Sequence, residues 1–558
     1  MTEQELRALI AGGETLTVEF KSDLGPLSDS DLIEAVACLA NRQGGVLLIG
    51  VEDDGRVTGL HPRHRTGPES LAAFVASRTV PPVTVEAAFF NLSEGQVAQL
   101  TIPPAFQPVS TSDGRLLIRY LDVHSRPGCR PLYAYELSSW LGERGRTDTS
   151  STIVPFATWG DLDPLEFVRL RRMVEENVGD QSLLELSDPD IARALGLIQR
   201  VEDRVVPTVA GLLLVGKEEV LRERIPAHEV AFQVLHGTDV KVNEFRRWPL
   251  LRGHEWLIEA ISVRNEEQEL LVNGGRVAVP RYDRAGVREA INNALIHRDY
   301  TSLGAVHVQL HDDYLRVGNP GGFPVGVRPD NLLTADPRPR NPTLADAFKR
   351  IGLVEKTGRG TSIIYIGQLR NGRRPPNYAH SGDAGVLVML DSGPADLDFV
   401  RTRVHANRRL ARALRVEELL ALWMAWQQGT VTPAQLAPVI QRTAVEAASL
   451  LQAFADTDML HRISDGYHLP FDLVPASRRP AIGPDDIIMD QVRRRGKITR
   501  REAVAVTGLE DEQARYQLRK LVAAGLLEQA GTGRDAYYRV PQRERNGESS
   551  GNSPQIPR

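Results

Sequence analysis

The stretch REAINNALIHRDY, residues 288–300, holds the densest group of chemically useful side chains in this chain of 558 residues. Hydrophobic residues at helical spacing predict a helix over Ala285–His297. Glu289, Asn293 and His297 follow one another at intervals of four residues, which places them on one face of that helix. A carboxylate and an amide one turn apart can hold a water molecule and a hydrated Mg²⁺ ion beside a triphosphate.

Two glycine-rich segments follow this helix. After the predicted strands Val306–His311 and Tyr314–Gly318 comes GNPGGFP, at Gly318–Pro324, and EKTGRG follows at Glu355–Gly360. Because glycine has no Cβ, its backbone N–H can approach a phosphate closely. The helix face and the two glycine segments together predict a cradle for phosphate and magnesium.

Four phrases carry a family resemblance: REAINNALIHRDY, VGNPGGFP, RPRNPTLADAF and GLVEKTGRG. They resemble the GHKL-type ATP-binding domain, and more closely a bacterial group labelled RecG-like or predicted transcriptional regulators. The resemblance implies ATP and Mg²⁺ as cofactors, with Glu289 as the water-activating catalytic base and Asn293 as the Mg²⁺ ligand. It implies that Gly321 and Gly322 border the adenine pocket and that Gly358 and Gly360 line the phosphates. The full predicted cofactor-binding set is Asn293, His297, Asn319, Gly321, Gly322, Lys356, Gly358 and Gly360.

One departure from that family concerns the base-reading position. The family uses an aspartate in a DxGxG box, whereas this chain has Asn319 followed by Pro320. An amide both donates and accepts hydrogen bonds, so adenine recognition remains compatible with the sequence. Weak ATP hydrolysis and a purely structural domain without nucleotide are both left open.

A near match to a P-loop, GLLLVGK at Gly211–Lys217, is rejected. Its residues Leu212–Val215 predict a buried strand, and Glu218 stands where a P-loop has Ser or Thr. The sequence therefore shows no helicase motor.

The N-terminal part carries a second set of candidate residues. Glu14 and Glu19 are five residues apart, Lys21 follows, and Asp53 comes directly after the predicted buried strand Val46–Val51. The segments GETLTVEFKSD and GGVLLIGVEDDGRVTGL resemble the Schlafen AlbA-like domain, over about residues 13–142. That resemblance implies that Glu14, Glu19 and Asp53 are metal ligands and catalytic residues for RNA cleavage, and that Lys21 contacts the nucleic acid.

Two alternatives remain open for this part of the chain. Glu52 or Asp54 could replace Asp53 as the third ligand. The domain could also bind nucleic acid without cleaving it, with its acids forming a solvated turn.

The C-terminal region contains a similar unit twice. Each copy has the order helix, short helix, longer helix and hairpin, which is the order of a winged helix-turn-helix. Thr432 and Thr499 stand where an N-cap belongs. In the second copy the predicted contacts to nucleic acid are Arg515, Arg519, Lys520 and Arg534. The acidic start of its third helix, Glu510–Glu512, is typical of a protein-binding unit instead.

Composition limits the classes of function. Lys and Arg number 67 against 72 Asp and Glu, a net charge of −5 that argues against a uniformly basic coat for nucleic acid. The two cysteines, Cys38 and Cys129, exclude a zinc site built on thiolates and a disulfide framework. The N-terminus lacks the pattern of a signal peptide, and hydrophobic runs are too short for a membrane span, so a cytoplasmic protein is expected.

These observations predict a multi-domain α/β and α+β protein. We expect an ATP-binding, DNA-binding transcriptional regulator whose conformation depends on the nucleotide, with DNA favoured over RNA as partner and a homo-oligomer allowed. The alternatives are a Schlafen-like metal-dependent nuclease acting on RNA or tRNA, in phage defence, and an assembly scaffold. The expected domains are 1–145 (Schlafen AlbA-like, nucleic-acid-binding), 160–275 (linking α/β domain), 276–395 (GHKL-like, ATP-binding), 410–473 (winged-helix-like unit), 484–541 (winged helix-turn-helix) and 542–558 (disordered tail).

Overall fold

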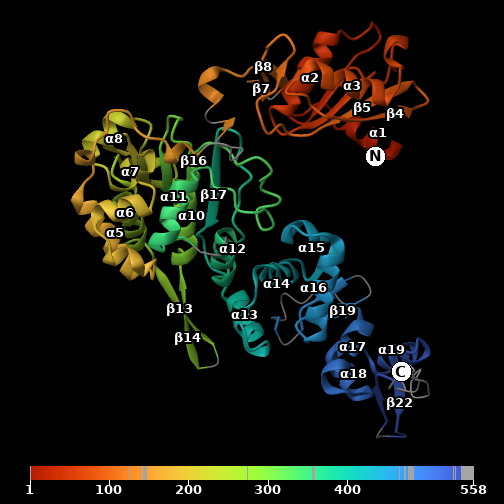
Figure 1. The fold of residues 1–558 in the computed structure, drawn as a ribbon. Helices are drawn as coiled ribbons and strands as arrows, with labels where there is room; N and C mark the ends of the chain where they lie inside the picture. Colours follow the sequence, from red (N-terminus) through yellow and green to blue (C-terminus); the bar gives the residue numbers. More distant parts are fainter. Residues whose placement is uncertain are drawn as a thin grey trace, which may run out of the picture. The chain divides into compact units, whose positions relative to one another are not determined.

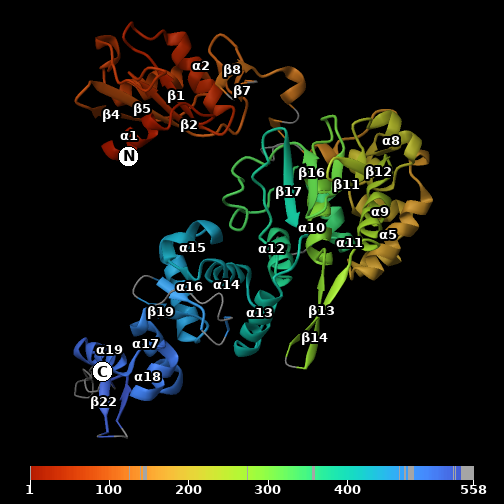
Figure 2. The same ribbon diagram turned by 180° about the vertical axis from the view of Figure 1, so that it is seen from behind.

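A computed structural model shows how these segments fold (Figures 1 and 2). It describes residues 2–122, 124, 126–137, 140–141, 148–272, 274–354, 359–463, 466–470, 473–474, 483–531, 533 and 536–541. The chain divides into two compact units. The first unit comprises Met1–Glu266, Arg281–Ile364 and Pro375–Gly393, and the second comprises Glu267–Pro280, Tyr365–Arg374 and Pro394–Arg558.

The N-terminal part of the first unit is built on a four-stranded sheet with the order β1-β2-β5-β4. Strand β1 pairs with β2 in parallel, and the other pairs are antiparallel. Helix α2 begins after Ser28, whose side chain accepts a hydrogen bond from the N–H of Asp31, and buries its hydrophobic face on the sheet. The elements are α1 (Glu3–Ala11), β1 (Val18–Lys21), α2 (Asp29–Ala40), β2 (Gly45–Ile49), α3 (Pro68–Arg78), β3 (Thr79–Val80), β4 (Glu86–Asn91), β5 (Gln96–Ile102), β6 (Ser110–Thr111), β7 (Leu117–Leu121) and β8 (Pro127–Pro131).

The two cysteines correct one prediction. Cys38 of α2 and Cys129 of β8 are joined by a disulfide, although they are 91 positions apart in the sequence. The β7–β8 hairpin folds against α2, and this contact between distant segments brings the sulfurs together. Sequence spacing carries no information about such a pairing.

A second correction concerns Val209–Val215, which forms helix α7 and not a buried strand. The Thr208 side chain accepts a hydrogen bond from the N–H of Gly211 and so caps the helix. A short hydrophobic run has no polar positions to reveal its period, so a strand and a buried helix give the same pattern. The elements around it are α5 (Pro164–Glu176), α6 (Asp188–Ala194), β9 (Ile198–Val201), β10 (Arg204–Pro207), α8 (Glu218–Arg224) and α9 (Leu250–Ser262).

A five-stranded sheet with the order β12-β11-β15-β16-β17 forms the centre of the first unit. Only β11 and β15 are parallel neighbours. The sheet joins strands from both sides of the predicted boundary at residues 275 and 276, and one hydrophobic core spans them. Helices α9 and α10 contact each other and this sheet (Figure 2). The elements are β11 (Val230–His236), β12 (Asp239–Arg246), α10 (Arg284–His297), β15 (Val306–Leu310), β16 (Tyr314–Pro320), α11 (Pro342–Ile351), α12 (Gly360–Arg370) and β17 (Gly385–Asp391).

The second unit contains the repeated C-terminal segments. Thr432 and Thr499 are N-caps, each within a reciprocal capping box, as predicted. The hairpin β13–β14 also belongs to this unit, where it packs on α13. The elements are β13 (Glu267–Val272), β14 (Gly275–Pro280), α13 (Leu397–Arg409), α14 (Val416–Gln428), β18 (Thr430–Val431), α15 (Pro433–Ile440), α16 (Ala444–Asp456), β19 (His461–Ile463), β20 (Gly466–His468), α17 (Pro484–Arg495), β21 (Ile498–Thr499), α18 (Arg500–Thr507), α19 (Asp511–Ala523), β22 (Glu528–Ala530) and β23 (Tyr537–Arg539).

The two copies share one element order: a helix, a short strand, two helices and a hairpin that pairs with the short strand. Each therefore closes its own three-stranded sheet, β18-β20-β19 in the first copy and β21-β23-β22 in the second. Among the described residues, every helix is too short or too polar to traverse a lipid bilayer.

Two histidines are buried in the core of the central part. His228 is 1% exposed and makes a hydrogen bond of 2.7 Å to the carbonyl of Trp248. His254 on α9 is 5% exposed. Burial lowers the pKa of both side chains to about 4, because the protonated ring loses its hydration.

These two histidines predict a loss of stability in mild acid. Between pH 6.5 and 4 the unfolded chain takes up protons that the folded chain does not, so the free energy of unfolding should fall by roughly 1 kcal/mol per pH unit for each histidine. Chemical denaturation of the full chain at pH 7, 6 and 5 measures this slope. His254→Leu should reduce it, and an unchanged slope in that variant would contradict the assignment.

Candidate functional site

A cavity of about 630 Å³ lies in the first unit beside helix α10. Its polar wall contains Glu289, Asn293 and His297 from α10, Asn319 at the end of β16, and Gly360 at the start of α12. The structure therefore brings together five of the residues that the sequence predicts, from three separate segments. Its other lining residues include Phe323, Val327, Lys349, Thr361, Ile364, Tyr378, Val386 and Val388.

Helix α10 is held in a fixed rotation by its ends and its buried face. Asp283 caps the helix by accepting a hydrogen bond of 2.9 Å from the N–H of Gly286. Asn292, fully buried, donates from Nδ2 to the carbonyl of Leu353 at 2.6 Å. Asn341 donates to the carbonyls of Ile296 and Arg298 at 2.7 and 2.8 Å and so satisfies the end of the helix. These contacts leave the face with Glu289 toward the cavity.

Glu289 and Gly360 approach each other too closely for any side chain at position 360. Glu289 is 4% exposed, and a Cβ built on Gly360 would lie 1.9 Å from its Oε1 atom. The glycine therefore allows the first turn of α12 to reach the carboxylate. This places the N–H groups at the start of α12 and an acid on the same stretch of wall.

His297 is a neutral ring at physiological pH. Burial, with a smaller contribution from the charge of Arg340, lowers its pKa to about 4. A neutral imidazole can donate or accept one hydrogen bond, so His297 offers polar contact to a ligand without adding a positive charge.

The glycines after Asn319 are placed differently from the prediction. Gly321 has φ +90°, and a Cβ there would meet Asp299, while a Cβ on Gly322 would meet the carbonyl of Gly382. Neither is among the residues that line the cavity, which resumes at Phe323. The two glycines instead form the tight turn between Asn319 and Phe323, which do line the cavity. Lys356 and Gly358 lie outside the described residues.

The hydrophobic side of the cavity is absent from the sequence prediction. Phe323 and Tyr378 have ring centroids 6.2 Å apart and share this side with Ile364, Val386 and Val388. Most of these residues lie in strands and irregular segments with no motif of their own. The alternation along β17 could have identified Val386 and Val388 as residues facing one way, but not what they face.

The N-terminal acids do not form a compact ligand group. Glu19 is 5% exposed and makes ion pairs with Arg119 and, at 2.5 Å, with Lys21. Glu14 accepts a hydrogen bond of 2.8 Å from the N–H of Phe20, and Asp53 is exposed on its turn. In the part of the chain that the structure describes, these three carboxylates do not gather within ligand distance of one another.

Arg119 explains why Glu19 is buried. Its guanidinium is 2% exposed and donates to the carbonyls of Thr15 and Val18, each at 3.1 Å. The pair joins β7 to β1 through charge-assisted hydrogen bonds. The positive charge that a metal would supply to Glu19 is already supplied by this arginine and by Lys21.

The basic residues of the second C-terminal copy are partly neutralised. Lys520 pairs with Asp485 at 2.5 Å, and Arg515 lies 3.5 Å from Glu512. Arg519 is exposed on α19. Arg534 lies outside them.

Models of three protein families match parts of the chain. The model described as Schlafen, AlbA_2 matches residues 14–126. The model described as "Putative ATP-dependent DNA helicase recG C-terminal" matches residues 304–390. The chain contains a Schlafen AlbA_2 domain and a recG C-terminal-like domain. Both resemblances inferred from the sequence are thereby confirmed, and a domain of unknown function matches residues 139–231 between them.

The recG-type match begins at residue 304, after helix α10. Glu289 and Asn293 therefore lie outside the matched residues, and their place on the cavity wall is the observation that supports them as site residues. A crystal structure of the DIP2311 protein from Corynebacterium diphtheriae is similar at 22% identity and a TM-score of 0.49, covering 96% of this chain and 99% of that one. No curated protein matches the chain.

Gly360→Ala tests the polar wall. The new Cβ would force the Glu289 carboxylate or the start of α12 to move, so a Mg²⁺·ATP ligand of this cavity should be held at least about tenfold more weakly, as expected when a hydrogen bond to a charged group is lost. Calorimetric titration of the full chain measures the affinity. Gly382→Ala is the matched control, because a Cβ there meets nothing within 4 Å. Equal loss in both variants, or in neither, would refute the proposed contact.

Glu19→Ala tests the role of the N-terminal acids. It leaves Arg119 buried without its carboxylate, so the local free energy of unfolding should fall by about 3 kcal/mol. Hydrogen exchange of peptides covering β1 and β7 measures this loss. Asp53→Ala, on an exposed turn, should change it by less than about 0.5 kcal/mol.

The same two variants address RNA cleavage. A nuclease that uses Glu19 and Asp53 as metal ligands requires both acids, so its activity would disappear in Asp53→Ala as well as in Glu19→Ala. Metal-dependent cleavage by the wild type that is lost in Asp53→Ala would contradict a structural role for these residues.

Proposed function

We propose that this protein binds Mg²⁺·ATP in the cavity beside α10 and binds nucleic acid, with DNA favoured, as a nucleotide-responsive regulator. The observation that carries this proposal is the wall that unites Glu289, Asn293 and Asn319 with Gly360. The central domain is then a GHKL-like sandwich, and its relation to the recG C-terminal model supports that assignment. The C-terminal copies are then winged-helix units.

The cavity has two sides that suit the two ends of ATP. Phe323, Tyr378 and the valines of β17 form a hydrophobic side for a purine ring. Glu289 and Asn293 lie on the polar side, where a hydrated Mg²⁺ ion would accept oxygen ligands from them. The start of α12 offers N–H groups to phosphate.

Each polar residue has a distinct expected role. Asn293, half-buried, would hold the magnesium ion, and Glu289 would orient or deprotonate a water molecule beside it. Asn319 donates from Nδ2 to the carbonyl of Pro320 at 3.0 Å, which fixes its amide plane at the wall. Lys349 lines the same cavity and would contribute positive charge toward phosphate.

Nucleic-acid binding is proposed from three features. The N-terminal domain matches the Schlafen AlbA_2 model. Both C-terminal copies have the element order of winged helices, and α19 presents the exposed Arg519. The nuclease alternative gains no support from the N-terminal acids, because the most buried of them is already paired with arginine and lysine.

A DNA mobility-shift titration tests the function. Mg²⁺·ATP should change the DNA affinity of the wild type by about fivefold or more, the usual lower range for coupled sites. Asn293→Ala should bind DNA and show no response to ATP. Asn243→Ala, an exposed amide on β12, is the matched control and should respond like the wild type.

Three outcomes of this titration would count against the proposal. Equal affinities with and without ATP would remove the coupling. An unchanged response in Asn293→Ala would place the nucleotide elsewhere. Failure to bind nucleic acid at any salt concentration would favour an assembly scaffold.

A further inference from the structure

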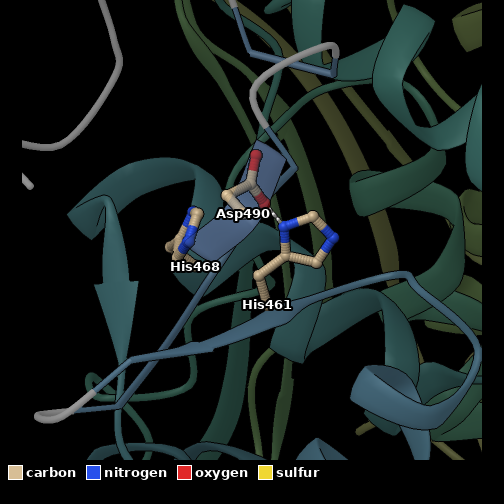
Figure 3. A group of neighbouring side chains, drawn as sticks. All are labelled: His461, His468 and Asp490. Atoms are coloured by element: carbon tan, nitrogen blue, oxygen red, sulfur yellow. Dashed lines mark ion pairs between the residues drawn. The ribbon is translucent and has the colours of Figure 1, made fainter. Parts of the chain in front are cut away.

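Three buried side chains meet within the second unit, on elements that do not line the proposed nucleotide cavity (Figure 3). His461 begins β19, His468 ends β20, and Asp490 lies on α17. They are 3%, 1% and 1% exposed, and one ligand atom from each lies within 4.8 Å of the others. The group thus joins the hairpin of the first C-terminal copy to the first helix of the second copy.

The two imidazoles have different polar partners. Nε2 of His461 lies 2.6 Å from a carboxylate oxygen of Asp458, and Nδ1 of His468 lies 2.7 Å from the carbonyl of Leu469. The carbonyl of Leu469 only accepts, so His468 carries its proton on Nδ1 and has its lone pair on Nε2. His461 has a carboxylate at each nitrogen, because its Nδ1 contacts Asp490. When the proton of the neutral His461 ring is on Nε2, toward Asp458, its lone pair is on Nδ1.

A lone pair on Nδ1 of His461 requires a positive charge beside it. Its Nδ1 is in direct contact with the carboxylate of Asp490, as the dashed line in Figure 3 shows. Two electron-rich atoms attract each other only through a cation between them, and a buried carboxylate needs such compensation most. A proton on Nδ1 of His461 would remove the repulsion within the pair of His461 and Asp490. A metal ion would also use the third donor, His468.

The pattern around the group matches that of metal ligands. Histidines that bind metal usually donate their other N–H to a carboxylate or a backbone carbonyl, which is what His461 and His468 do here. Two imidazoles and one carboxylate suit zinc and its neighbours, whereas Mg²⁺ and Ca²⁺ prefer oxygen ligands. A hydrogen bond also joins the two copies at this place, since the side chain of Arg493 in α17 donates to the backbone carbonyl of Arg462 in β19 at 2.9 Å.

We propose that His461, His468 and Asp490 bind one divalent transition-metal ion, with zinc as the first candidate, and that the ion fixes α17 to the β19–β20 hairpin. Water or one further donor completes the tetrahedral coordination that zinc prefers. The site is independent of the nucleotide cavity, and its role is to set the arrangement of the two C-terminal copies.

Metal analysis of the untagged full chain, purified without a metal-affinity step and dialysed against zinc, tests this site. The wild type and His236→Gln, which changes an exposed histidine paired with Asp312, should each retain about one zinc ion per chain, as expected for a single site that holds one ion. Asp490→Asn and His468→Gln should bind zinc at least about tenfold more weakly. Asp458→Asn should weaken binding to a smaller extent, because it removes only the partner of His461.

A second measurement covers the case in which a variant loses its local fold. Thermal unfolding of the wild type, stripped with a chelator, should shift upward when zinc is added, because a ligand of the folded state alone stabilises it. Asp490→Asn should not shift. If the wild type retains no more zinc than Asp490→Asn and its unfolding does not respond to the metal, the group is an imidazolium–carboxylate pair and the proposal is wrong.

Discussion

The buried hydrogen bond from Asn292 to the carbonyl of Leu353 fixes the rotation of helix α10, and therefore which of its side chains face the cavity. Neighbouring residues on a helix point about 100° apart, so fixing Asn292 in the core fixes the direction of Asn293. A rotation of that size would turn Glu289 and Asn293 into the core and remove the polar wall of the cavity. The cost of leaving a buried amide unsatisfied therefore protects the geometry of the site as well as the fold.

The sequence predicted the features that local patterns encode. The spacing of Glu289, Asn293 and His297 was enough to place them on one face, and the threonines before α15 and α18 were enough to locate two N-caps. The repeated element order of the C-terminal region was also visible. In each case the physical cause lies within about one or two helical turns of the residue concerned, where sequence and structure are directly linked.

Features set by contacts between distant segments could not be predicted in the same way. The Cys38–Cys129 disulfide, the burial of Glu19 by Arg119 and the cluster around His461 all depend on which elements pack together. The predicted strand in the run that forms helix Val209–Val215 was wrong for a different reason. A wholly buried hydrophobic run shows no polar period, so its pattern does not distinguish a strand from a helix. Strands β11 and β15 lie on either side of residue 276 in the sequence and belong to one sheet. They pair in parallel, and a parallel pair needs a long connection that local patterns do not reveal.

Glu19 and Glu289 show why a motif alone does not define a metal site. Both are buried acids in segments that resemble metal-dependent families, with 5% and 4% exposure. Glu19 has a guanidinium and an ammonium group in contact, so a further cation would have to compete with charges that are already desolvated there. Glu289 instead meets the start of α12 across a glycine, on the wall of a cavity that can admit a hydrated ion. The difference lies in the surroundings: Glu19 is held between two cations, whereas Glu289 lines a cavity, and the proposed function therefore places magnesium beside α10.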